Sequence, residues 1–460
     1  QENLNVEGLN TLFHHDRLML SYNPKKDTYL GNSIGYVDES LSIKVNKKVS
    51  FPTWQMSSTV GMIHASVVVE VDDKIPFNSN FDYYLNSLAK LLMPEGLFCY
   101  SEPKLLNGIE VNDLKERSIY TLFRFVKQHY RTRWVFLLFF NFIIYEKKWA
   151  FLPFVSAFFY SKRNADSIAI DTIKVASSRK VIASKTIDVI IPTIGRKDYL
   201  YDVLQDLAKQ SLLPKKVIVV EQNPLQDSIS ELDYLTNENW PFQIKHIFTR
   251  QAGACNARNL ALKEVEHEWV FLADDDIVFN ANFFENAFYS IEQYGSEAAS
   301  FCCLQKGEKT QLNTYMQWGA FGSGCSMIAA KSSMQCRFDT GYEFGYGEDN
   351  DFGMQLRNLG HDVLYFPQPE ILHLKAPIGG FRTKPLLSWS NDEIQPKPSP
   401  TVMLFQIAHK TKEQNLGYKT ILFLKYYRQQ SIRNPFKYYF AFEQQWNRSL
   451  YWANKLDKKR

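Results

Sequence analysis

Cysteine is scarce and irregularly spaced in this chain of 460 residues. The six cysteines are Cys99, Cys255, Cys302, Cys303, Cys325 and Cys336. None forms a Cys-x-x-Cys pair and no histidine cluster lies beside them, which argues against a disulfide framework and against a structural zinc site. The first residues also lack the charged-then-apolar layout of a signal peptide. Together these absences predict a cytoplasmic location.

An excess of charge of either sign is missing as well. The chain has 53 Lys and Arg against 49 Asp and Glu, a net charge of +4. That balance argues against a dedicated nucleic-acid binder, whose surface would be strongly basic. Hydrophobic residues make up 45% of the chain, which suffices for large cores and excludes a disordered or fibrous protein. The length predicts about three domains.

A membrane-spanning helix needs about twenty apolar residues, and the apolar runs here are shorter. Trp134–Tyr145 is followed by Trp149–Tyr160, and Glu146-Lys147-Lys148 separates the two. Aromatic residues with Lys and Arg at their margins are typical of an in-plane membrane anchor. A helical hairpin buried between domains explains the pattern equally well, and both interpretations stay open. The first would place a peripheral protein on the inner face of the cell membrane.

Residues 1–130 are predicted to form an N-terminal α/β accessory domain. We expect a hairpin within Ile34–Val49, a strand at the β-branched run Ser66–Val71, a helix over Phe81–Leu92 and a strand at Leu97–Tyr100.

Part of this domain, Leu88–Leu106, resembles the late helix, turn and strand of Rossmann-like methyltransferases. The Gly-rich turn that would cradle their cofactor is absent, since Gly31, Gly35 and Gly61 stand apart. A non-catalytic accessory domain is therefore favoured over a second activity.

The remaining chain divides into three predicted segments. Residues 131–186 hold the apolar hairpin and a polar linker, 187–380 alternate strands with helices, and 381–460 form a helical extension. The expected strands and helices of the middle segment are Ile187–Ile191, Tyr199–Gln210, Lys216–Val220, Ile244–Phe248, Ala257–Val265 and Trp269–Ala273. This alternation predicts a mostly parallel sheet with helices on both faces. The basic and aromatic C-terminal helices suit a cap on that domain, which we favour, or an anionic membrane surface.

Three adjacent acidic residues, Asp274–Asp276, follow the apolar strand that ends at Ala273. In extended chain Asp274 and Asp276 point to the same side. Carboxylate oxygens suit Mg²⁺ or Mn²⁺, and ligands of open α/β sheets bind at the carboxyl ends of the strands. The alternative is a solvated acidic turn.

A second acidic motif, Gly345–Gly353, contains Glu348, Asp349 and Asp351 at the start of a predicted helix. Acidic residues at a helix N-terminus are also explained by the helix dipole. His373 follows a further strand. A lone histidine is usually structural, but beside two acidic clusters His373 becomes a candidate for a third metal ligand.

These motifs, in this order, resemble family 2 glycosyltransferases of the GT-A fold over residues 187–375. The matching segments are Val189–Thr193, Gln251–Asn259, Asp274–Asp276 and Gly347–Asp351, with His373. The resemblance implies a Rossmann-like GT-A domain that transfers a sugar, in a metal-dependent reaction, from a nucleoside-diphosphate sugar, with a UDP-sugar favoured. The implied acceptor is a hydroxyl of a carbohydrate or of a lipid-linked glycan.

The resemblance also assigns roles to individual residues. The nucleotide side of the site would comprise Pro192, Thr193, Glu221, Gly253, Arg258, Asp274 and Asp275. Asp276, Asp274 and His373 would hold Mn²⁺ or Mg²⁺. Asp349, next to Glu348, would be the general base. Glu221 stands where relatives often have an aspartate for the uracil ring, so the nucleotide base stays open.

The expected chemistry needs these groups. The metal neutralises the leaving diphosphate, and a carboxylate takes the proton of the acceptor hydroxyl. One base, one metal ion and in-line attack imply inversion, although the sequence alone leaves a retaining mechanism open.

Two loops extend the predicted site. Trp318–Gly324 would stack on the acceptor sugar or form a tight turn with a core tryptophan, with neither interpretation favoured. We also expect a mobile loop after His373 that closes over the diphosphate, with Lys375 or Arg382 as its phosphate partner. The rival functions are a bifunctional enzyme with a methyltransferase-like N-terminal domain, and a non-catalytic carbohydrate-binding protein with a degenerate transferase fold.

Overall fold

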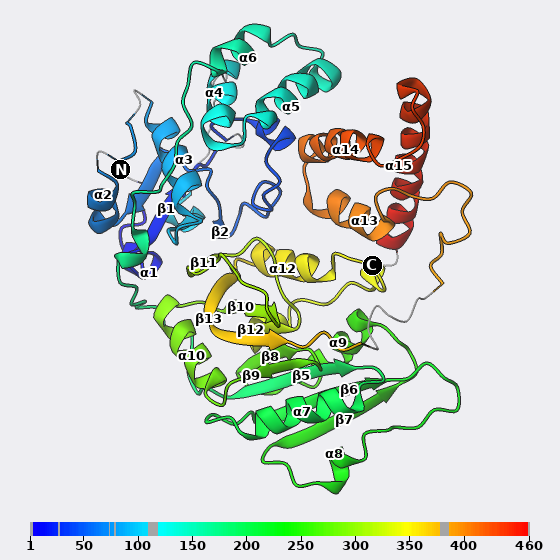
Figure 1. Ribbon diagram of the computed structural model, residues 1–460. Coiled ribbons are helices and arrows are strands. Elements are labelled where there is room, and N and C mark those ends of the chain that lie inside the picture. The colour runs from blue at the N-terminus through cyan, green and yellow to red at the C-terminus, as the bar shows by residue number, and fades with distance from the viewer. Residues whose placement is uncertain are drawn as a thin grey trace. The chain divides into compact units, whose positions relative to one another are not determined.

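The computed structural model describes residues 3–25, 28–72, 74–77, 80–108, 118–377 and 386–458. It divides into two compact units (Figure 1). The first comprises Gln1–Val175 and Ile394–Tyr451, and the second comprises Ala176–Glu393 and Trp452–Arg460. The apolar hairpin and most of the C-terminal helices thus lie in one unit with the N-terminal residues, rather than as the separate segments 131–186 and 381–460.

A four-stranded sheet of order β2-β4-β1-β3 forms the base of the first unit. Its strands are β1 (Leu18–Tyr22), β2 (Phe51–Pro52), β3 (Val60–Ile63) and β4 (Phe98–Ser101). Strands β1 and β4 run parallel, and the other neighbours are antiparallel. The predicted helix over Phe81–Leu92 is present as α3, with the Asn80 side chain accepting a hydrogen bond from the Tyr83 N–H, as N-cap residues do. The strand β4 lies within one residue of its prediction.

Two predicted elements of this unit are wrong. Ile34–Val49 contains the end of a 3₁₀ helix, η1 (Asn32–Tyr36), and these residues, all described, form no strand. The run Ser66–Val71 lies in the helix α2 (Ala65–Val71). Val67 and Val71, four residues apart, are buried, so this run is buried with helical rather than strand periodicity.

The apolar hairpin consists of α5 (Arg133–Asn141), the π-helical turn η3 (Phe142–Glu146) and α6 (Phe151–Ala157). It packs on α4 (Ile119–His129), and its inner side chains, among them Leu138 and Phe142, belong to the core of the first unit. Of the helices described, none is long and apolar enough to cross a membrane.

The C-terminal helices are α13 (Pro400–His409), α14 (Lys412–Tyr427) and α15 (Pro435–Asp457). Thr411 and Gln414 form a capping box at the start of α14. Gly417 lies directly against η1, because a Cβ added there would stand 2.3 Å from the Tyr36 carbonyl oxygen. The Gln414 side chain donates to the Asp38 carbonyl at 3.0 Å. These contacts fix α14 to the N-terminal part of its own unit. The remaining short elements of this unit are α1 (Leu9–Leu12), η2 (Pro103–Leu105) and η4 (Ile170–Thr172).

The second unit is built on a nine-stranded mixed sheet, with the path β11-β13-β10-β12-β8-β5-β6-β7 and β9 paired to β13. Its strands are β5 (Ile187–Thr193), β6 (Lys216–Gln222), β7 (Gln243–Thr249), β8 (Trp269–Ala273), β9 (Ile277–Phe279), β10 (Ala298–Gln305), β11 (Met316–Gln317), β12 (Cys325–Ala329) and β13 (Leu364–His373). Strands β8, β5, β6 and β7 are parallel, as predicted, and β12 joins them antiparallel. Residues 217–220 of β6 are fully buried, as in a sheet covered on both faces.

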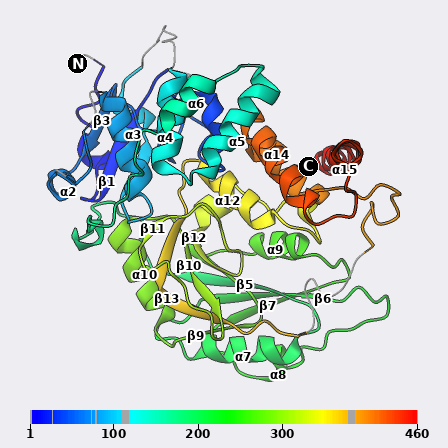
Figure 2. The same cartoon turned by 45° about the horizontal axis from the view of Figure 1, so that its top comes forward.

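Helices cover both faces of this sheet (Figure 2), with α7 on one and α9 and α12 on the other. The helices of this unit are α7 (Lys197–Ala208), α8 (Tyr234–Asn237), α9 (Ala254–Leu262), α10 (Phe283–Tyr294), α11 (Ala330–Ser333), η5 (Thr340–Tyr342) and α12 (Glu348–Asn358). The N-termini of α9 and α12 and the carboxyl ends of β5, β6 and β8 all line one cavity, which is where a ligand site of an open α/β sheet is expected.

Candidate active site

The cavity of the second unit has a volume of about 520 Å³. Its walls include most of the predicted site residues: Pro192, Thr193, Gly253, Arg258, Asp274, Asp275, Asp276, Glu348, Asp349, His373 and Lys375. These residues come from several separate elements and turns. The sheet order therefore assembles side chains that are far apart in the sequence.

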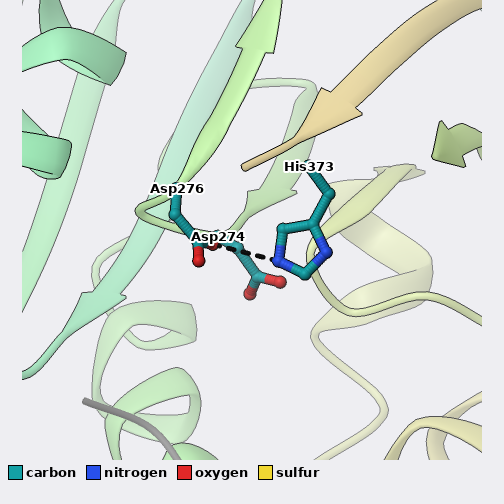
Figure 3. A group of neighbouring side chains, drawn as sticks. All are labelled: Asp274, Asp276 and His373. Carbon is teal, nitrogen blue, oxygen red and sulfur yellow. Dashed lines mark ion pairs between the residues drawn. The ribbon is translucent and has the colours of Figure 1, made fainter. Parts of the chain in front are cut away.

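A cluster that could hold a metal ion lies at one side of this cavity (Figure 3). Asp274, Asp276 and His373 each offer one ligand atom, and these atoms lie within 4.8 Å of one another. Pairing of β9 with β13 sets Ile277 opposite His373. The turn that carries the aspartates, between β8 and β9, is thereby held beside the histidine.

The chemistry of this cluster fits a divalent cation. His373 Nε2 lies 3.2 Å from Asp276 Oδ1. That oxygen is buried, yet it accepts no well-aligned hydrogen bond from any described residue. Two carboxylates and an imidazole are ligands that Mn²⁺ accepts, and Mg²⁺ favours the carboxylates. The donors are therefore suited to the metal that the sequence predicted.

Arg196, in the loop after β5, forms ion pairs with two aspartates of the acidic turn. Its Nη1 lies 2.6 Å from Asp275 Oδ1 and 3.3 Å from Asp276 Oδ2. Asp276 Oδ2 also accepts from the Ala376 N–H at 2.8 Å. Burial opposes ionisation of Asp276, but His373, the Ala376 N–H and Arg196 together hold its pKa below the usual value.

Asp275 lies in the turn between β8 and β9 and is not part of the cluster of Asp274, Asp276 and His373. Its Oδ2 accepts a hydrogen bond of 2.7 Å from the Thr193 hydroxyl. Burial raises the pKa of Asp275 to about 6, although Arg196 opposes the shift. The Asp275 side chain therefore links the turn to β5.

Asp274 is positioned by Arg258 and by a glycine. Arg258 Nη2 donates to Asp274 Oδ1 at 3.1 Å, and its guanidinium lies over the Phe338 ring at 5.5 Å. A Cβ added to Gly324 would stand only 2.1 Å from Asp274 Oδ2. A larger residue there would force the Asp274 carboxylate to move.

The N-terminus of α9 is held by a residue that the sequence did not single out, Glu343. Its carboxylate accepts hydrogen bonds from the N–H groups of Cys255 at 3.1 Å and Asn256 at 3.3 Å. Gly253, with φ +146°, donates its N–H to Gln222 Oε1 at 2.7 Å. A Cβ at Gly253 would meet Glu343 at 2.0 Å, so the glycine is required by both space and conformation.

Asp349 and Glu348 open α12 and face the cavity. Asp349 Oδ1 is buried and has no hydrogen-bond partner among the described residues. Burial raises the pKa of Asp349. Burial, and then the charge of Asp349, raise the pKa of Glu348 to about 7. A carboxylate with a raised pKa that faces a cavity suits proton transfer near neutral pH.

Two predicted contributors, Glu221 and Trp318, are not among the described residues that line the cavity. The Glu221 carboxylate turns to Ser230, to the Glu231 N–H and to His246. Its role toward the nucleotide base stays a prediction.

Trp318 stacks on Tyr365, with ring centroids 4.7 Å apart, in a small apolar cluster. The end of its loop, Gly322–Cys325, does line the cavity. Arg382 lies outside the described residues.

The residues that sequence reasoning missed are Arg196, Gln222 and Glu343. Arg196 lies between β5 and α7, Gln222 ends β6 and Glu343 follows η5. Only Gln222 had a usable signal, since it directly follows the predicted Glu221 at the carboxyl end of a parallel strand.

Sequence comparisons agree with these observations. The family model described as Glycosyl transferase family 2 matches residues 188–346. Two curated relatives are the poly(ribitol-phosphate) beta-N-acetylglucosaminyltransferase TarS of Staphylococcus aureus strains Mu50 and MW2. Each is 29% identical over 112 residues, which are 24% of this chain and 19% of the relative. The chain thus matches less than a fifth of the length of these relatives.

Among solved structures, similarity is more distant. The S. aureus TarS 1–349 structure in complex with UDP-GlcNAc is 17% identical with a TM-score of 0.35, covering 51% of this chain and 70% of that chain. GalNAc-T7 with UDP, GalNAc and Mn²⁺ is 12% identical with a TM-score of 0.35, covering 46% and 49%. The assignment therefore rests on the family match and on the mixed sheet with its acidic motifs. Residues 188–346 form a glycosyl transferase family 2 domain with the α/β GT-A fold.

Proposed function

We propose that this chain is a metal-dependent, inverting glycosyltransferase that moves a sugar from a nucleoside-diphosphate sugar to a hydroxyl acceptor. One observation carries the proposal. A single cavity is lined both by the cluster of Asp274, Asp276 and His373 and by Asp349, whose buried Oδ1 has no hydrogen-bond partner in the part of the chain that the structure describes. A metal cluster and a proton acceptor are the two functions that the reaction needs.

The residues of the cluster would hold Mn²⁺ or Mg²⁺, which when bound neutralises the charge that develops on the leaving diphosphate. Arg196 would keep the turn of Asp275 and Asp276 in place, and Arg258 would orient Asp274. Lys375 also lines the cavity and lies two residues after His373. Its ammonium group would pair with the diphosphate.

Asp349 would act as the general base. Its Oδ1 would accept the proton of the acceptor hydroxyl while the hydroxyl oxygen attacks the anomeric carbon and the bond from that carbon to the diphosphate breaks. A base on the acceptor side and a metal on the leaving-group side favour in-line attack, and hence inversion.

The first donor to test is a UDP-sugar. The curated relatives are named as N-acetylglucosaminyltransferases, so UDP-N-acetylglucosamine is the first choice among them. A glycan or lipid-linked glycan as acceptor, and a cytoplasmic location, stay predictions of the sequence.

The deciding experiment is a thermal-shift panel with UDP, GDP and CMP, each with and without Mn²⁺. Ligands that bind only the native state raise its apparent stability. We expect one nucleoside diphosphate to raise the unfolding temperature only with Mn²⁺, and Asp276→Ala to abolish the rise. Asp227→Ala, in an exposed loop, is the matched control and should keep it. A panel without any shift would favour the non-catalytic carbohydrate-binding alternative.

A second activity in residues 1–130 has less support. Among the strands described there, only β1 and β4 run parallel, whereas a dinucleotide-type cofactor fold uses an extended parallel sheet. S-adenosylmethionine belongs in the same panel, and a rise with this compound would restore the bifunctional alternative.

A further inference from the structure

The hairpin of α5, η3 and α6 exposes an unusual number of large apolar side chains. We call this surface the hairpin patch, and it comprises Phe136, Phe140, Ile144, Trp149, Phe151, Leu152, Val155, Phe158 and Phe159. Three of them are mostly exposed, with Phe159 at 85%, Trp149 at 74% and Leu152 at 68%. Large exposed apolar surfaces of this kind mark interaction sites.

Ring contacts link side chains at both ends of the patch through Phe154, which is half-buried, and Phe139, which is buried. Phe136 lies 5.7 Å from Phe158, and both rings contact Phe154. Phe154 stacks on Phe139 at 4.6 Å, and Phe139 reaches Trp149 at 5.6 Å. This chain of rings joins α5 to α6 from the base of the hairpin to its tip.

The hairpin is also firmly attached to its unit. Val135, Leu138 and Phe142, on the inner side of the same helices, are 2% exposed or less and belong to the core of the first unit. Figures 1 and 2 both show α5 and α6 beside α4. The outer side chains are therefore displayed by a packed element, and not by a loose segment that could fold them inward.

Positive charge surrounds this apolar surface. The segment from Arg131 to Lys162 contains five Lys or Arg and one acidic residue, Glu146. Lys147 and Lys148 are exposed and directly precede Trp149, which places cations beside the aromatic tip. Tryptophan with neighbouring lysines is typical of the interface between lipid headgroups and acyl chains.

We propose that the hairpin patch inserts into an anionic phospholipid surface. Helices of nine and seven residues are too short to span a bilayer, so the hairpin would lie in the plane of the headgroups. The apolar side chains enter the boundary with the acyl chains and the five cations face the phosphates. This inference goes beyond the transferase activity and does not depend on it.

The test is flotation of the full-length chain with vesicles. One set contains equal parts of phosphatidylcholine and phosphatidylglycerol, and the other contains phosphatidylcholine alone. We expect binding to the anionic vesicles, weaker binding to the neutral ones, and loss of binding as salt is raised. The triple variant Trp149→Ser, Leu152→Ser, Phe159→Ser should bind at least about tenfold more weakly, and so should Lys147→Glu combined with Lys148→Glu.

A matched control removes exposed apolar side chains elsewhere. Leu225 and Ile229 are 70% and 80% exposed, and Leu225→Ser with Ile229→Ser should leave flotation unchanged. Unfolding temperatures equal to that of the parent chain would show that the hairpin variants are folded. Equal flotation of the parent and the triple variant would overturn the proposal. So would self-association that depends on the patch in a chain that binds no vesicles, because the patch would then be covered by a second copy.

Discussion

At the scale of single residues, the proposed base Asp349 allows donor binding and the chemical step to be tested separately. Asp349→Asn keeps the shape of the side chain but removes the proton acceptor. We expect kcat to fall by about two to four orders of magnitude while the Mn²⁺-dependent thermal shift with the nucleotide is retained. Steady-state kinetics and the thermal-shift assay together check this.

Asp351→Asn is the matched control on the same helix. Its carboxylate accepts from Gln355 and Tyr342 and does not line the cavity, so this variant should keep kcat. Full turnover by Asp349→Asn would remove that residue from the role of base.

The pH dependence of turnover follows from the two neighbouring carboxylates. Burial raises the pKa of Asp349, and burial with the charge of Asp349 raises that of Glu348 to about 7. The proposed base, Asp349, works only when ionised, so kcat should fall with falling pH, at a midpoint above the usual aspartate pKa. Glu348→Gln removes one of the two charges and should move the midpoint to lower pH. A midpoint that stays in place in this variant would contradict the coupling of the two groups.

At the scale of elements, the start of α9 depends on a single glycine. In Gly253→Ala the new Cβ would stand 2.0 Å from Glu343 Oε1 at a φ of +146°. Either Glu343 leaves the helix N-terminus or the turn moves. We expect a loss of about 1–3 kcal/mol in the free energy of unfolding and a weaker nucleotide shift. Denaturant unfolding measures the first and the thermal-shift assay the second.

Gly319→Ala provides the comparison, because a Cβ there has open space and its φ is ordinary. This variant should unfold like the parent chain. Equal stabilities of the two alanine variants would show that Glu343 adapts without cost.

The elements also show where local patterns mislead. The β-branched run Ser66–Val71 favours a strand by composition, yet it forms α2. The His64 side chain accepts the Ser66 N–H at its start, and two valines four residues apart are buried. Packing of one helical face outweighs the weak intrinsic preference of β-branched residues.

At the scale of the whole molecule, the two units should respond differently to substitution. Gly417→Ala in α14 places a Cβ 2.3 Å from the Tyr36 carbonyl oxygen, a backbone atom of the same unit. We expect unfolding to be easier by about 1–3 kcal/mol. The nucleotide shift with Mn²⁺ should persist, because every residue that lines the cavity lies in the other unit.

Lys425→Ala, an exposed position of the same helix, is the control and should change neither quantity. If Gly417→Ala abolished the nucleotide shift, a substitution in the first unit would affect ligand binding in the second. The two units would then not act independently.

Several elements and site residues of this protein could be predicted from the sequence alone. The strand β8 lies where it was predicted, and Asp274–Asp276 follow it into the cavity. Glu348 and Asp349 open a helix, as the glycine-rich acidic motif indicated. These features are local: burial of a strand, alternation of side chains and the start of a helix are set by residues close together in the chain.

The tertiary structure alone decided which distant side chains meet. Arg196 pairs with Asp275 across 79 positions, Glu343 accepts from Cys255 across 88, and the Ala376 N–H reaches Asp276 across 100. The division of the chain into units was decided at the same level, since α14 returns to η1 over a distance that no periodicity encodes. Such contacts depend on sheet order and on close approaches at Gly253, Gly324 and Gly417. Hydrophobic patterning fixes which face of an element is buried, but not which partner covers it.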